Sequence, residues 1–170
     1  MKSRIFNGIV FLYFGFFAVV TMGFAVYWHD FKKAPEQPID FSHELHVGQL
    51  KFACTLCHQT VERAISASVP PLSKCMECHK AVATDKEEVK KLTQYWENQK
   101  PIPWEKVYSV PEHVYFSHKR HIKAGLDCSS CHGELAAQAR VRKVTTLKMG
   151  FCIDCHKARD ASRDCYTCHK

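Results

Sequence analysis

The pentapeptide C-x-x-C-H occurs five times, and it constrains what this chain can fold into more than any other feature. The five copies, called motif 1 to motif 5 in chain order, are residues 54–58, 75–79, 128–132, 152–156 and 165–169. Together they contain all ten cysteines, namely Cys54, Cys57, Cys75, Cys78, Cys128, Cys131, Cys152, Cys155, Cys165 and Cys168. Each motif ends in a histidine, and these are His58, His79, His132, His156 and His169.

This spacing is the one that covalent haem attachment requires. Two thiols three positions apart add to the two vinyl groups of one haem, and the adjoining histidine reaches the iron from the same side. Zinc ribbons use such units in pairs, which would strand the fifth, and redox dithiols do not repeat five times with a histidine after each. A disulfide framework would require haem attachment to fail. We therefore predict five covalent haems c, with the motif histidines as proximal iron ligands.

Two matching phrases supply histidines for the opposite side of the iron. Residues 41–58 read FSHELHVGQLKFACTLCH and residues 116–132 read FSHKRHIKAGLDCSSCH, which indicates an internal duplication. From the phenylalanine to the first cysteine is thirteen residues in the first phrase and twelve in the second. Histidines at i and i+3 share one side of a helical turn and can each serve a different haem. The predicted distal ligands are His43, His46, His118 and His121.

These four histidines leave the distal position of one haem open. The candidates are Met149 in LKMGFCIDCH, His113 in VPEHVYFSH, and His29 beside the apolar N-terminal segment. A methionine ligand would raise the potential of its haem above that of bis-histidine neighbours. Eleven histidines and Met149 make twelve ligands, or six pairs. The count therefore leaves room for a sixth haem held without thioethers, with His29 as one ligand.

The N-terminal segment is typical of a membrane anchor. Ile5 to Tyr27 is a run of 23 uncharged, mostly apolar residues, and a helix of that length extends about 34 Å, against a hydrocarbon core of about 30 Å. Lys2 and Arg4 precede the run, which predicts a cytoplasmic N-terminus and a domain facing the periplasm. A cleaved signal peptide shares the basic start, but its apolar core is shorter. We expect a single-pass protein of the inner membrane.

The rest of the chain divides by its motifs. We expect residues 1–30 to form the cytoplasmic start and anchor, and residues 31–170 a periplasmic multihaem domain. Within it, residues 38–83 form a module with two haems, 84–113 a helix and linker, and 114–170 a module with three haems. Thr84 and Glu87 resemble a capping box, which predicts a helix over 85–98. The fold class is mainly α with long loops and almost no sheet, and the haems themselves form most of the core.

The order of these motifs resembles a known family. The set F-S-H-x-x-H, V-P-P-x-x-x-C-M-x-C-H, V-Y-F-S-H-x-x-H and K-M-G-F-C-x-x-C-H, behind one anchor, is similar to a cytochrome subunit of bacterial quinone-linked respiratory complexes. That group includes the multihaem subunit of the quinone reductase complex of sulfate reducers and the pentahaem subunit of alternative complex III. The resemblance implies molybdopterin-like, iron–sulfur and integral membrane partner subunits, and it favours Met149 over His113 as a ligand.

These observations favour an electron carrier over an enzyme. The chain would relay electrons through five haems between a soluble periplasmic redox partner and a membrane quinone-oxidoreductase complex. The alternative is a stand-alone, membrane-anchored quinol dehydrogenase that feeds a periplasmic reductase. A multihaem nitrite or sulfite reductase would need a haem with an open face, whereas histidines are in excess here. The formal charge of +7 is partly offset by haem propionates, and no basic run with interleaved aromatics indicates nucleic-acid binding.

Overall fold

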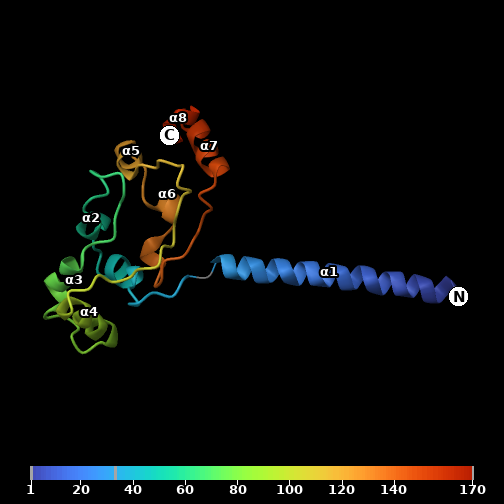
Figure 1. Cartoon of the computed structure of the whole chain (residues 1–170), viewed down its shortest axis with the longest axis horizontal. Coiled ribbons are helices and arrows are strands. Elements are labelled where there is room, and N and C mark those ends of the chain that lie inside the picture. The colour runs from blue at the N-terminus through green and yellow to red at the C-terminus, as the bar shows by residue number, and fades with distance from the viewer. Residues whose placement is uncertain (1, 33, 170) are drawn as a thin grey trace. The chain divides into compact units, whose positions relative to one another are not determined.

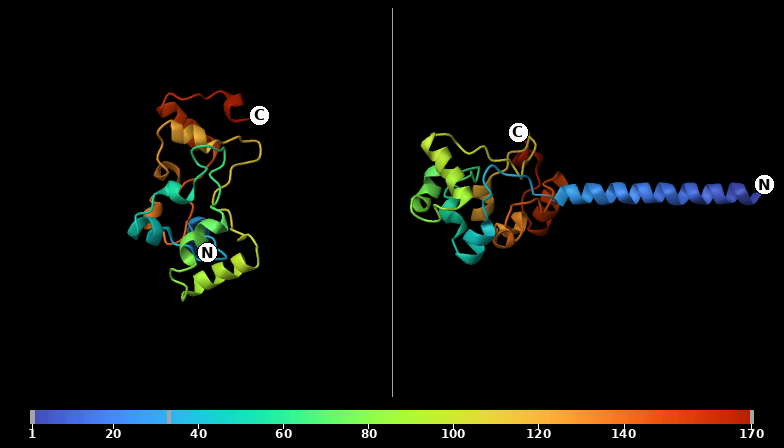
Figure 2. Two further views of the ribbon diagram at one scale, coloured as in Figure 1. Left: turned by 90° about the vertical axis from the view of Figure 1, so that its left-hand side faces the viewer. Right: turned by 90° about the horizontal axis from the view of Figure 1, so that it is seen from below.

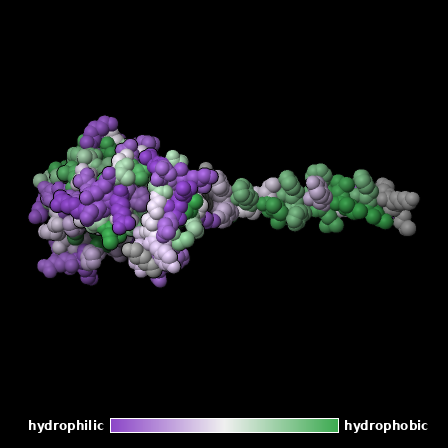
Figure 3. Space-filling model, turned by 90° about the horizontal axis from the view of Figure 1, so that it is seen from above, coloured by the Kyte–Doolittle hydropathy of each residue, from purple (hydrophilic) through white to green (hydrophobic). Residues whose placement is uncertain are grey.

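The chain forms two compact units, which we describe separately. The computed structural model describes residues 2–32 and 34–169. The first unit is the helix α1, Lys2–Lys32, and the second begins at Ala34 (Figure 1). Within α1, Arg4–His29 is long and apolar enough to cross a membrane, with a mean hydropathy of 2.3. Figure 3 shows its apolar side chains along the described part of the helix. This is the helix that the sequence predicts.

The second unit consists of short helices joined by long loops. In chain order they are the π-helix η1 (Glu44–Gln49), α2 (Cys54–Cys57), α3 (Leu72–His79), α4 (Glu87–Glu97), α5 (His118–Lys123), α6 (Ser129–His132), the 3-10 helix η2 (Leu135–Ala137), α7 (Met149–Ala158) and α8 (Cys165–Cys168). The described residues contain no strand, and one isolated bridge joins Val114 to His169. The expectation of a mainly helical domain with almost no sheet is confirmed.

Five of these helices carry the five motifs, and the motifs explain why they are short. A single turn, such as α2 or α8, is enough to place the two cysteines of a motif three positions apart on one side. At α8 the carboxylate of Asp164 caps the turn by accepting a hydrogen bond of 2.9 Å from the backbone N–H of Tyr166. Each such helix therefore fixes an attachment site and does not need further length.

The polypeptide itself buries few apolar side chains. Among the described residues, the buried apolar ones are Ile39, Val61, Met76, Val89 and Leu92. Ile39, Met76 and Leu92 form one cluster between α3 and α4, with Leu72, Cys75, Tyr95, Ile102 and Trp104 packed around it. Motif 2 lies on α3 and is therefore held by ordinary side-chain packing. Among the described residues, no comparable cluster of buried apolar side chains surrounds the other motifs.

The helix after the first module differs in its start from the prediction. It was expected over 85–98 with a Thr84–Glu87 capping box, but α4 begins at Glu87 with Lys86 as N-cap and no side-chain cap. Glu87 and Glu88 instead occupy the first turn, where their negative charges interact favourably with the helix dipole. They also form ion pairs with Lys90 and Lys91. At the other end Gln99 takes a left-handed conformation, and Lys100 N–H donates to the carbonyl of Tyr95 in a Schellman motif.

Candidate haem-binding sites

Four of the five proximal histidines are oriented by the same hydrogen bond. In each, ring Nδ1 lies near a backbone carbonyl: that of Ser68 for His58 (3.0 Å), Val82 for His79 (3.2 Å), Ser162 for His156 (2.6 Å) and His113 for His169 (3.2 Å). A carbonyl oxygen only accepts, so Nδ1 carries the hydrogen and Nε2 keeps its lone pair. A histidine that ligates a metal through Nε2 is held in this way.

The loop after α7 shows how the chain builds such a bond. Asp160 adopts a left-handed conformation with φ of 51°, which ends α7 in a Schellman motif. The N–H of Ala161 then donates to the carbonyl of His156 at 2.8 Å. This return brings the carbonyl of Ser162 to the ring Nδ1 of the same histidine. The loop thus fixes both the backbone and the ring of the motif 4 histidine.

The two F-S-H-x-x-H phrases have the same side-chain geometry. The Phe41 ring lies 4.9 Å from that of His43 and 4.5 Å from that of His46, measured between centroids. The corresponding Phe116 distances are 4.8 Å to His118 and 4.5 Å to His121. The second histidine of each phrase also places Nδ1 2.8 Å from the carbonyl of the phrase's serine, Ser42 or Ser117. One phenylalanine therefore supports both histidines in each copy.

The backbones of the two copies differ by one residue, and a π turn accommodates it. The first copy forms the π-helix η1, whereas the second forms the α-helix α5. A π turn holds one residue more than an α turn, which matches the longer interval in the first phrase. Both turns then end in a left-handed residue three positions before the first cysteine, Lys51 (φ 58°) in one copy and Gly125 (φ 75°) in the other. The extra residue is therefore absorbed before the attachment motif.

Three predicted distal histidines each face a proximal histidine. Ring centroids are 6.2 Å apart for His46 and His79, 6.5 Å for His118 and His132, and 6.0 Å for His121 and His156. Two imidazoles on opposite sides of one metal, each bonded at about 2.0 Å, have centroids about 6 Å apart. These separations fit an iron between the rings, so the residues present suit bis-histidine haem.

The fourth predicted distal histidine, His43, is partly buried, and its buried Nδ1 has no hydrogen bond. Burial first, and then the nearby His58, lower the pKa of His43 to about 4. Its ring is therefore neutral at pH 7, as a metal ligand must be. Burial likewise lowers the pKa of His118 and of His132. His43 lies on the same turn as His46 and near the proximal histidine of motif 1.

His113 is the histidine that the structure brings to motif 5. Its ring centroid lies 5.4 Å from that of His169, and its carbonyl accepts from the His169 ring. The backbones also meet here, because Tyr115 N–H donates to the carbonyl of Cys168 at 2.8 Å. Met149 is the first residue of α7 and its side chain is 64% exposed. His29 lies in α1, in the other unit.

Two residues that the sequence analysis did not single out hold motif 3 in place. The Tyr108 ring lies 4.8 Å from the His132 ring at 83°, and the Tyr108 hydroxyl accepts from Val144 N–H at 2.9 Å. Gln138 is buried, and its Nε2 donates to the carbonyl of His132 at 3.3 Å. The backbone carbonyl of Gln138 also accepts from Glu44 N–H at 3.0 Å, which ties this loop to η1. Both residues lie outside the repeated phrases and carry no local signal.

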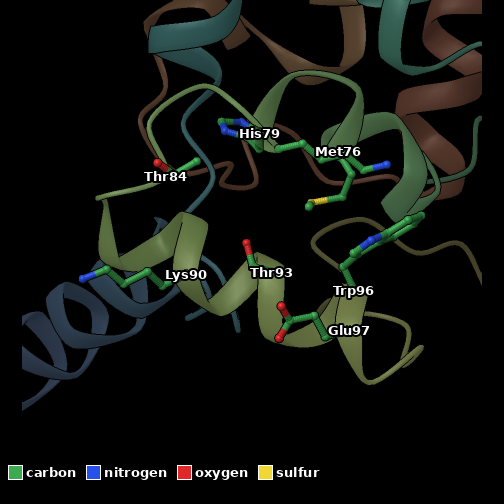
Figure 4. Close-up of a pocket in the computed structure, with 8 residues that line it drawn as sticks. Met76, His79, Thr84, Lys90, Thr93, Trp96 and Glu97 are labelled. Atoms are coloured by element: carbon green, nitrogen blue, oxygen red, sulfur yellow. The ribbon is translucent and has the colours of Figure 1, made fainter.

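A cavity of about 520 Å³ opens beside motif 2. Its lining includes Met76 and His79 of α3 and Thr93 and Trp96 of α4, and Figure 4 shows Met76 and Trp96 directed toward the space between the helices. Lys80 Nζ lies 5.1 Å from the centre of the Trp96 ring, in a cation–π contact. The size is in the range of small-molecule and cofactor sites. The cavity borders motif 2 through Met76 and His79.

Burial also governs the attachment thiols. It is the main cause of the raised pKa of Cys57, Cys75, Cys128, Cys131 and Cys152. A thiol with a raised pKa stays protonated at neutral pH and is a poor nucleophile for oxidation or metal binding. These five thiols are therefore partly shielded from solvent.

Comparison with known proteins gives consistent results for the two halves of the domain. Residues 25–104 match the class III cytochrome c family, and residues 114–170 match cytochrome c7 and related cytochromes c. The chain is also 31% identical over 162 residues to the menaquinone reductase multihaem cytochrome c subunit of Nitratidesulfovibrio vulgaris. That alignment covers 79% of this chain and 77% of the relative. The chain belongs to the family of multihaem cytochromes c that includes this subunit.

Proposed function

We propose that the chain is the electron-relay subunit of a membrane quinone-oxidoreductase complex and carries five covalent haems c. Each haem iron gains and loses single electrons. The observation that carries the proposal is the set of facing histidine rings at separations that suit an iron between them. The protein's own part is to orient ligand imidazoles, such as those of His58, His79 and His156, by hydrogen bonds from Nδ1 to backbone carbonyls, with Nε2 directed away from the carbonyl.

We assign one distal histidine to each motif. The pairs are His43 with His58, His46 with His79, His118 with His132, His121 with His156, and His113 with His169. His113 is preferred to Met149 because its ring lies beside the His169 ring, whereas Met149 is mostly exposed. With five bis-histidine pairs, no methionine would raise one potential above the others. His29 and Met149 are left without a haem, so the total is five rather than six.

The relative's name supports a quinone-linked role. It is the cytochrome subunit of a menaquinone reductase, and we propose that this chain has the same kind of role. The order of the motifs resembles that of cytochrome subunits of quinone-linked complexes. By that resemblance, the proposed partners are molybdopterin-like, iron–sulfur and integral membrane subunits. Lys2 and Arg4 before the anchor favour a domain on the periplasmic side, where it would exchange electrons with a soluble redox protein.

Two measurements test this proposal. The intact mass of the purified chain, with a pyridine haemochrome assay of total haem, should give five covalent haems and no sixth. Purification of the tagged protein from native membranes in mild detergent should recover the partner subunits, identified by mass spectrometry. Recovery of the chain alone, with haems that quinol reduces directly, would instead indicate a stand-alone quinol dehydrogenase.

A further inference from the structure

We propose that the five motifs form one unbranched row in the order motif 2, motif 1, motif 3, motif 4, motif 5. This order differs from the chain order and rests on the proposal that all five motifs carry haem. The helices follow it in Figure 1 and in the left view of Figure 2, with α3 at one end of the domain, α2 and α6 between, and α7 and α8 at the other end.

Within the first module, one helical turn joins motifs 1 and 2. His46 faces His79 of motif 2, whereas His43, three residues before it, lies near His58 of motif 1. The attachment cysteines agree, since Cys57 lies within electrostatic range of both cysteines of motif 2. Motif 2 therefore has motif 1 as its neighbour.

The modules meet at motifs 1 and 3. The first cysteines of the two motifs, Cys54 and Cys128, lie close to one another. The ring Nδ1 of His118 also lies 3.4 Å from the carbonyl of Ile65, in the loop after motif 1. His58 also lies within electrostatic range of both rings that flank motif 3, His118 and His132.

Backbone contacts also join the two modules at this junction. His118 N–H donates to the carbonyl of Ile65 at 2.9 Å, and η1 packs on η2 with Gly48 against the Ala136 carbonyl. A side chain at position 48 would separate η1 from η2. Motif 1, not motif 2, is thus the contact between the first module and the second.

The second module continues the row in chain order. His118 and His121, on one turn, face His132 of motif 3 and His156 of motif 4. Cys131 lies near Cys152 and Cys155 of motif 4. Motif 4 meets motif 5 through Ser162, whose carbonyl lies 2.6 Å from the His156 ring Nδ1 and whose hydroxyl lies 3.0 Å from that of Thr167 in motif 5. Cys152 also lies near Cys168 of motif 5. For an electron to cross the whole domain, partner proteins must reach motif 2 and motif 5, and the electron must pass the motif 1–motif 3 junction.

A matched pair of variants on one turn tests the order. In each variant, H46M or H43M, one haem has either a methionine ligand on its distal side or no distal ligand. Either change raises the reduction potential of that haem, called the marked haem, so that it is reduced first. The haem methyl signals of the four haems that are still oxidised are then followed by NMR in the full-length holoprotein. Reduction of the marked haem should shift the signals of one other haem in H46M and of two in H43M. One shifted haem in H43M, or two in H46M, would overturn the row.

The result is separable from failure of the proposed function. Intact mass decides first whether five haems are attached, and a lower number refutes the relay itself. If H43M does not load five haems, a ruthenium photosensitiser is attached at R163C or V82C in the H46M background, because both side chains are exposed and lie outside the attachment motifs. Flash reduction should reach the marked haem directly from V82C, and from R163C only by way of the other haems. Simultaneous arrival from both labels would contradict the order.

Discussion

The first and second F-S-H-x-x-H phrases reach the same ring arrangement on different backbones. The phenylalanine-to-histidine distances agree to within 0.1 Å between copies, yet one turn is a π-helix and the other an α-helix. The inserted residue has been absorbed where it does not change the position of either histidine. The positions of ligand rings are therefore under tighter constraint than the helix that carries them, as is common where π turns occur at functional sites.

Removal of the second histidine in each copy should have the largest effect. In H46A and in H121A, one haem keeps only its proximal histidine, so one haem in five should change from low-spin to high-spin. Absorption and EPR spectra of the oxidised holoprotein measure the fraction. If the two copies are equivalent, H46A and H121A should lose the same fraction of low-spin haem. A fully low-spin spectrum in either variant would show that another residue ligates that haem.

Gly48, in the first copy, packs closely against the second module. A Cβ at Gly48 would overlap the carbonyl oxygen of Ala136, which is backbone and cannot turn aside. We expect G48A to lower the free energy of unfolding by about 1–3 kcal/mol through overpacking. G150A, in α7 with open space around it, is the control and should change it little. Denaturant unfolding followed by circular dichroism gives both values, and equal values would contradict the close contact.

The left-handed residue that ends each turn gives a reciprocal test. Lys51 holds this conformation with a side chain and Gly125 without one. We expect K51G to stabilise and G125K to destabilise the protein by roughly 0.5–1 kcal/mol each. The same unfolding measurement applies. Changes of the same sign in both variants would mean that the two turns do not end alike.

The smallest expected effect concerns the ion pair that joins the segment before the first copy to the loop after η2. A hydrogen bond from Arg140 Nε, 2.9 Å from Asp40 Oδ1, is the main reason that the pKa of Asp40 is lowered. The resulting stability is present above the ordinary pKa of 3.8, and it is lost as the pH falls through the lowered value. Both side chains are open to solvent, which screens the pair, so the gain is small. In D40N, stability between pH 5 and pH 2 should fall less steeply.

The sequence predicted the parts of the site that are local. Each motif and each F-S-H-x-x-H phrase lies within a few residues, so spacing alone indicated the attachment and ligand residues. Tyr108 and Gln138 act over longer separations, and nothing in their neighbours marks them. The Thr84 capping box was wrong because local cap preference is weak against the packing of α4 on α3. The choice between Met149 and His113 likewise depends on the pairing of distant segments, residues 113–115 with 168–169.

The proximity of Cys54 and Cys128 has a consequence for how the protein matures. A disulfide between these two thiols would consume one cysteine of motif 1 and one of motif 3, and it would block two haem attachments at once. If the domain matures in an oxidising compartment, attachment of haem at either motif before the modules close on one another removes the thiols from that reaction. The junction therefore ties the order of assembly to the final arrangement of the motifs.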